Sequence, residues 1–517
     1  MEKDSFIDKV QGQPVDPYRG SILDPVAPEH CNGEALIGSI YRTLFFSDPA
    51  KVEKEAGKVA VEELHKSFEK HNDCWQYLFN KGVLTSSGPR KSPTPYLYPY
   101  VPQIALHSAV LGKPRKSRWL PGNLFLNCVF SGSNPSEHRE NIQLIRKALK
   151  ADETGDVFAY FVERSFEAVD GYKEIVEDEI KPKSASAWRD RDTNFRLETP
   201  AERFVADILY ICSIRGFFPR RQWLAVLESL VRVGISCHQM WICRLNRNLG
   251  RLINSIIDEG ENITQRQVSD LWVEHHKDPF FELGGRAMGQ NGGPIDAVIR
   301  ENAEGRSAIT LACLALKELG QKFESPLGGQ KDFGVSKPSD KCLYEFIKIV
   351  SDNSQDILNL LKKVFGKSSF QDCLRDVLDS KPKLLKRAYG GYSQNIDYFF
   401  NYVLGQFQPE TNPPHSQRSH DQSYLLWKPS GAKLWHVKPG PATLLMFASC
   451  CSDQRRNLHP GIPASIESLT QYLAQYGIGI PQGELVDGYT GRELHRMGLL
   501  IDNPDGGGGR LIVDPFK

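Results

Sequence analysis

The chain has 517 residues, enough for about three domains of typical size, and its 64 Lys and Arg residues almost balance its 63 Asp and Glu residues. A hydrophobic content of 40% is that of a globular protein with buried cores. No apolar run approaches the roughly 20 residues of a membrane span, and the polar start lacks the apolar segment of a secretory signal. We therefore expect a soluble cytoplasmic protein without membrane contact.

Residues 1–170 predict a first, mostly helical domain. Polar residues over 1–32 favour an extended arm, and helices are predicted at 33–46 and within 48–70. A proline-rich stretch over 85–102 predicts a rigid loop. The charged segment 170–197 has few hydrophobic residues and predicts a domain boundary.

A basic segment beside Trp119 is the first candidate binding site. Cations next to an aromatic ring suit phosphate contact combined with base stacking. A solvated basic loop is the alternative interpretation. The cations of this segment are Lys113, Arg115, Lys116 and Arg118.

Residues 199–407 predict a helical middle domain, and a row of arginines in it is the second candidate site. Within 241–256, the spacing of Ile242, Leu245, Leu249 and Ile253 predicts a buried stripe. The spacing of the arginines predicts one exposed face that tracks phosphates or binds an acidic partner. Pairing with the protein's own acids is the alternative. These residues are Arg244, Arg247 and Arg251, preceded by Arg220 and Arg221 beside a turn at 216–219.

Further helices are predicted at 308–323, 341–351, 355–365 and 370–378. The glycine-rich stretch 284–293 lacks the Lys-Ser/Thr ending of a phosphate-binding loop, so we interpret it as a flexible loop. Residues 408–422 contain almost nothing that could pack and predict a flexible linker that isolates the last domain, 423–517.

The last domain carries an ordered set of predicted elements. Helices are expected at 442–451 and from 464 to Gly477, and a third is capped by Thr490 and ended by Gly498. Strands at 499–501 and 511–513 follow, joined by a turn that begins NPDG. This order resembles the winged helix-turn-helix superfamily. The resemblance implies a recognition helix with Arg492, His495 and Arg496 on its outer side.

The charge of this domain favours a protein partner. From residue 464 to 517 there are 4 basic and 7 acidic residues, and 4 − 7 = −3. Because phosphate contacts dominate affinity for duplex DNA, an acidic domain is poorly suited to bind it alone.

The sequence contains no recognisable catalytic, cofactor or metal site. Its 11 cysteines include no CxxC pair, and most lie singly in apolar stretches, as buried free thiols do. Cys237 and Cys243 lie six residues apart on a predicted helix, so they face different directions and cannot bind one ion together.

These features predict a mainly α, multi-domain protein with a C-terminal winged helix. The motifs PRRQWL at 219–224 and NPDG at 503–506 resemble segments of accessory proteins of prokaryotic antiviral defence operons. The resemblance implies a non-catalytic adaptor of a DNA-transaction or defence complex. Its partners would be other subunits (an ATPase, nuclease or methylase), with DNA as a further candidate. A sequence-specific DNA-binding regulator and an enzyme with an unrecognised active site are the alternatives.

Overall fold

A computed structural model gives the arrangement of the chain. It describes residues 3, 4, 7, 33–46, 85–86, 96–97, 99–103, 121–134, 136–151, 156, 159–160, 163, 180, 199–260, 277–288, 294–321, 342–379, 423–427, 435–481, 483–502 and 509–516. Within these residues the protein is mainly helical, as the sequence predicts.

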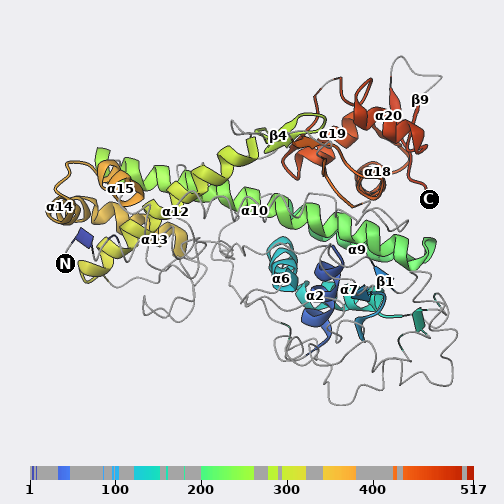
Figure 1. Cartoon of the computed structure of the whole chain (residues 1–517), viewed down its shortest axis with the longest axis horizontal. Helices are drawn as coiled ribbons and strands as arrows, with labels where there is room; N and C mark the ends of the chain where they lie inside the picture. The colour runs from blue at the N-terminus through green and yellow to red at the C-terminus, as the bar shows by residue number, and fades with distance from the viewer. Residues whose placement is uncertain are drawn as a thin grey trace.

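One long helix, α10 (Arg220–Glu259), runs through the molecule and organises it (Figure 1). It has 40 residues, longer than the sequence prediction, and the predicted stripe from Ile242 to Ile253 is fully buried. Apolar residues surround much of α10 because other elements cover it on several sides. The helices that pack against it are α2, α6, α9, α12, α13, α14, α15 and α18.

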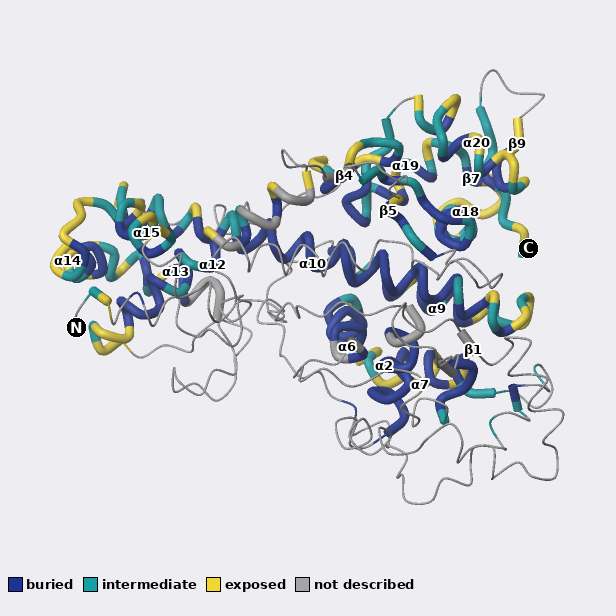
Figure 2. The backbone as a smooth tube through the Cα atoms, viewed as in Figure 1, coloured by how far each residue is buried: buried dark blue, intermediate teal, exposed yellow. Residues whose placement is uncertain are grey.

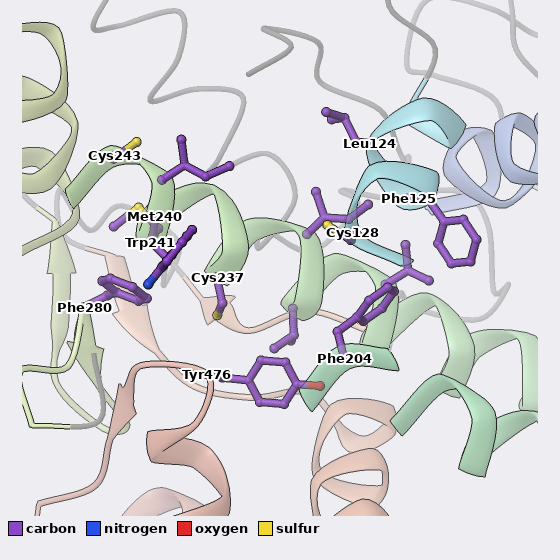
Figure 3. Close-up of a cluster of buried hydrophobic side chains, with 14 of the residues drawn as sticks. Leu124, Phe125, Cys128, Phe204, Cys237, Met240, Trp241, Cys243, Phe280 and Tyr476 are labelled. Carbon is purple, nitrogen blue, oxygen red and sulfur yellow. The ribbon is translucent and has the colours of Figure 1, made fainter. Parts of the chain in front are cut away.

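The first group of helices lies along one half of α10. It consists of α2 (Gly33–Phe45), α6 (Pro121–Gly132), α7 (His138–Leu149) and α9 (Pro200–Ser213), and short strands β1 (Thr85–Ser86) and β2 (Tyr96–Leu97) form an antiparallel pair nearby. Phe125 of α6 and Phe204 of α9 meet edge to face with ring centroids 5.9 Å apart. Figure 3 shows both rings beside α10, in the same buried cluster as Met240 and Trp241.

The second group covers the other half of α10. It contains α12 (Pro294–Glu318), α13 (Cys342–Asp352), α14 (Ser354–Phe365) and α15 (Phe370–Asp379). The last three lie where the sequence predicts them, whereas α12 begins 14 residues before the predicted range 308–323 and ends before that range does. Helices α10 and α12 approach closely where Gly250 faces Gly305, because neither residue has a Cβ to hold the backbones apart. Asn246 donates a hydrogen bond to Asn302 across the same contact, at 2.9 Å.

The C-terminal unit, from α18 to β10, contains every element predicted for it. Its order is α18 (Pro441–Leu458), β7 (Ala464–Ser465), α19 (Ile466–Ala474), β8 (Ile478–Gly479), α20 (Tyr489–Arg496), β9 (Leu500–Asp502) and β10 (Arg510–Ile512). Strands β7, β10 and β9 form an antiparallel sheet in that order. The predicted terminal glycines, Gly477 and Gly498, both adopt positive φ.

A segment of the middle region, residues 277–288, joins the C-terminal unit to α10; we call it the bridging segment. Its strand β3 (Phe281–Glu282) pairs in parallel with β8, and β4 (Arg286–Met288) pairs with β6 (Trp435–Val437), which also pairs with β5 (Leu426–Trp427). In the described part of the glycine-rich stretch, Gly284 and Gly285 lie in the turn between β3 and β4, and residues 286–288 form β4 itself, so the interpretation of this part as a flexible loop was wrong.

The C-terminal unit is also not isolated from the body, because α18 packs against α9 and α10. Figure 2 shows the buried flank of α18 turned toward the long helix. The predicted linker, residues 408–422, lies outside the described residues. The prediction of isolation was wrong because it weighed linker composition and not the packing on either side of it.

Candidate partner-binding and nucleic-acid interfaces

Helix α20 presents the three side chains that the sequence places on its outer side. Arg492, His495 and Arg496 are exposed, whereas Leu494 is fully buried against the unit. The helix has eight residues, of which Thr490, Gly491 and Leu494 are buried, whereas the three outer residues are exposed. The predicted orientation is therefore confirmed.

Glu484 fixes the start of α20. Its carboxylate accepts hydrogen bonds from the backbone N–H and the hydroxyl of Thr490, at 2.8 and 2.7 Å. Thr490 was expected to be the capping residue, but it lies in the first turn and Gly488 precedes the helix. A carboxylate is a strong acceptor at a helix N-terminus, where unpaired N–H groups and the helix dipole favour negative charge.

Most of the arginines of the C-terminal unit form ion pairs or hydrogen bonds inside that unit. Arg496 pairs with Glu493 at 2.6 Å, and Arg510 pairs with Asp502 at 2.9 Å. Arg492 donates to the backbone carbonyl of Asp487 at 2.8 Å, which holds the guanidinium but leaves its charge uncompensated. The outer face of α20 therefore carries mixed charge and not a continuous cationic stripe.

The arginine row of α10 differs from its prediction. Arg244 is only 5% exposed, and it pairs with Asp278 at 3.2 Å while its guanidinium lies 4.6 Å from the ring centroid of Phe280. Burial lowers the pKa of Arg244, and Asp278 opposes that shift. The prediction of one exposed face was wrong at Arg244, because the bridging segment covers this part of the helix.

The other two arginines of the row share one acidic partner on α12. Arg247 and Arg251 pair with Glu301, at 2.8 and 3.4 Å. The alternative interpretation, pairing with the protein's own acids, therefore describes all three arginines in this structure. They join α10 to α12 and to the bridging segment.

Arg220 is also an internal residue. It is buried at the start of α10 and donates to the backbone carbonyls of Tyr100, Leu149 and Lys150, the first at 2.6 Å. Arg221 is half-buried. Lys113, Arg115, Lys116 and Arg118 lie outside the described residues, so their predicted role stays a prediction.

A buried polar joint between α9 and α19 was not predicted from the sequence. Asp207 has no exposed surface, pairs with Arg203 one turn earlier, and accepts hydrogen bonds from Tyr472 and Tyr476 at 2.8 and 2.7 Å. Burial, followed by Asp207, raises the pKa of both tyrosines well above the ordinary value. The joint fixes the C-terminal unit against the body through side chains more than 260 residues apart in sequence.

Among the described residues, no group of three or more His, Cys, Asp and Glu side chains is arranged to hold a metal ion. None of the helices in the described part of the chain combines the length and apolar character needed to span a membrane. In comparisons with known proteins, the chain matches no protein-family model and no curated protein.

Proposed function

We propose that this chain is a non-catalytic adaptor subunit of a prokaryotic DNA-transaction or antiviral defence complex, and that its C-terminal unit is a winged-helix module that docks a protein. The order α18–β7–α19–α20–β9–β10, with the sheet order β7–β10–β9, supports the module. The resemblance of two short motifs to accessory proteins of defence operons supports the setting.

The outer face of α20 is the surface at which we propose that a protein partner binds. Its side chains Arg492, His495 and Arg496 are exposed, yet Arg496 is neutralised by Glu493 and the surrounding segment has a net charge of −3. Phosphate binding depends on uncompensated cations, and Arg492 is the one arginine of this face that is not neutralised. Mixed charge around an exposed helix instead suits the polar rim of a protein–protein interface.

The architecture of the body supports an adaptor. The C-terminal unit is held to α10 by the bridging segment, by α18 and by the buried Asp207 joint. A partner bound at α20 is thus connected rigidly to the long helix and to both groups of helices along it.

A sequence-specific DNA-binding regulator is the second candidate, and one observation favours it. Arg492 and His495 are exposed side by side on a helix that corresponds to the recognition helix of DNA-binding winged helices. Arginine in the major groove makes the commonest specific base contact.

Charge reversal on α20 separates the two candidates. The full-length protein and its Arg492→Glu/Arg496→Glu variant are purified under native conditions from the organism that makes them, and co-purifying proteins are quantified. We expect the variant to lose at least one partner that the unaltered chain retains at constant stoichiometry. The control Arg375→Glu, on α15 and 65% exposed, should retain it.

A gel-shift assay on genomic fragments completes the experiment. The docking proposal expects no retardation that depends on Arg492. Retardation by the unaltered protein that Arg492→Glu abolishes, with no change in co-purifying proteins, would establish the regulator instead. Unchanged partners together with unchanged DNA behaviour would refute both.

A further inference from the structure

The small sheet β4–β6–β5 has two unlike faces. On one face, Leu426 of β5 lies opposite Val437 of β6, and both side chains are fully buried. On the other face, His436 of β6 lies between Arg286 of β4 and Trp427 of β5 in direct cross-strand register. Opposed residues of neighbouring strands project to the same side, so Arg286, His436 and Trp427 form one row across the sheet.

This row is open to solvent. Arg286 is exposed, His436 is half-buried, and Trp427 is 40% exposed, although tryptophan is usually well buried. The exposed part of the Trp427 ring offers an apolar surface beside the cation Arg286, and a tryptophan ring can stack on a flat ligand.

More aromatic residues and a further cation extend the row toward α20. The ring of Tyr424 lies 5.6 Å from that of Trp427, and its hydroxyl reaches Tyr489, the first residue of α20. Lys438, two residues after His436 on the same strand line, places its ammonium 5.0 Å from the centre of the Tyr489 ring. We call the six residues the aromatic–cationic face: Arg286, His436, Trp427, Tyr424, Lys438 and Tyr489.

Most of the carboxylates on the adjoining elements already have a partner within the protein. Glu493 pairs with Arg496, and Glu484 caps α20. Glu282 is exposed on β3, which pairs with β8 in a separate sheet. No carboxylate belongs to the face itself, so its cations are available to an anionic ligand.

We propose that the aromatic–cationic face binds single-stranded nucleic acid, with bases stacking on Trp427 and the neighbouring tyrosine rings and phosphates contacting Arg286 and Lys438. Proteins that bind single strands combine aromatic rings on a sheet with cations that follow the backbone, and each stacked base adds substantially to affinity. A duplex keeps its bases stacked on one another, so it cannot use the rings. This proposal goes beyond docking at α20 and uses different residues.

Fluorescence anisotropy of the full-length protein tests the proposal. The probes are labelled oligothymidylate and oligouridylate of about 20 nucleotides, at about 50 mM salt, with a duplex of equal length as comparison. We expect binding to at least one single strand and weaker binding to the duplex. The two single strands distinguish DNA from RNA as the natural ligand, since both share the stacking and phosphate chemistry.

Three variants locate the binding. Trp427→Ala should weaken affinity about tenfold or more, whereas Trp427→Phe, which keeps an aromatic ring, should retain most of it. Arg286→Gln should reduce the slope of log affinity against log salt by about 0.7, the change expected for one lost phosphate contact on a single strand. Phe217→Ala is the matched control, because Phe217 is a 63% exposed aromatic residue that lies outside the face, in the turn before α10.

The proposal fails if the unaltered protein binds neither oligonucleotide, or if Trp427→Ala binds as tightly as Phe217→Ala. It also fails if Trp427→Ala removes a bound protein but leaves oligonucleotide binding intact, which would make the face a protein-binding surface. The failure of docking at α20 is separate, because it is measured with Arg492 and Arg496 variants and by co-purifying proteins.

Discussion

At the scale of single residues, Asp207 is a position where substitution should lower the free energy of unfolding strongly. It is a fully buried carboxylate with one cation and two hydroxyl donors, so all of its partners depend on its charge. A buried ion pair as a whole contributes little net stability, because desolvation offsets the attraction. Removal of one partner alone is different, since it leaves the other charge buried and uncompensated.

We therefore expect Asp207→Asn to lower the free energy of unfolding by about 3–5 kcal/mol, since Arg203 keeps its charge in a buried site. Tyr476→Phe removes one hydrogen bond and should cost about 1–2 kcal/mol. Urea denaturation followed by circular dichroism measures both. Equal losses for the two variants would contradict the role of Asp207 as the charged centre of the joint.

Whether a side chain is buried or exposed was predictable from the sequence only where it follows from the spacing of residues within one helix. The stripe from Ile242 to Ile253 and the outward direction of Arg492 follow from helical spacing. The burial of Arg244 depends on Asp278, 34 residues further along the chain, and spacing within α10 contains no information about that contact. The row through Arg286, His436 and Trp427 was missed for the same reason, because its register comes from three separate strands.

At the scale of elements, the bridging segment positions α20. Gly284, between β3 and β4, has φ +72° and lies against the carboxylate of Glu484, the group that caps α20. A side chain at this position would overlap that carboxylate. The bridging segment thus contacts Glu484, the residue that caps α20.

Gly284→Ala should destabilise the protein by about 2–4 kcal/mol, from strain at positive φ and from displacement of Glu484. Gly366→Ala is a matched control, because Gly366 has a similar φ of +68° but open space around it, and should cost only about 1 kcal/mol. Hydrogen exchange should show faster exchange at the first amides of α20 in Gly284→Ala alone. Equal protection of α20 in both variants would mean that Gly284 does not support the cap.

Long helices were predictable as elements, whereas the short strands of the bridging segment were not. Helices α13 to α15 have apolar periodicity and lie within one residue of their predicted ends, whereas α12 was predicted only over its second half. Strands β3, β5 and β8 have two residues each, too few to show alternation, and β3 and β8 pair with each other across almost 200 residues of sequence. A strand of two residues is too short to show the alternation of apolar and polar residues that identifies strands in a sequence.

At the scale of the whole molecule, buried ionisable groups make stability depend on alkaline pH. Eight cysteines whose side chains the structure describes are free thiols, and all eight are buried. Burial raises the pKa of the Cys212 thiol to about 12 from an ordinary value of 9.0, and raises those of Cys237, Cys243, Cys313 and Cys450 as well. The tyrosines of the Asp207 joint are shifted in the same direction.

Groups with a raised pKa in the folded state keep their protons after the unfolded chain has lost them. Their contribution to stability is thus complete below about pH 9 and is lost as the pH rises above it. We expect the free energy of unfolding to fall between about pH 9 and pH 11, by about 1.4 kcal/mol per pH unit for each thiol. Urea titrations in the presence of reductant measure this slope, and constant stability over the interval would contradict the burial of the thiols.

Helix α10 gives the molecule a fixed internal length. At 1.5 Å per residue, its 40 residues extend about 60 Å. Figure 1 shows α13–α15 gathered at one end of this span and α9 with the C-terminal unit toward the other. A ligand held near α20 and a second body held at α14 would be kept apart by a distance set by the number of helical turns between them. The length of α10 would then set the distance between the two bound bodies. A seven-residue insertion in α10 would lengthen that distance by about 10 Å.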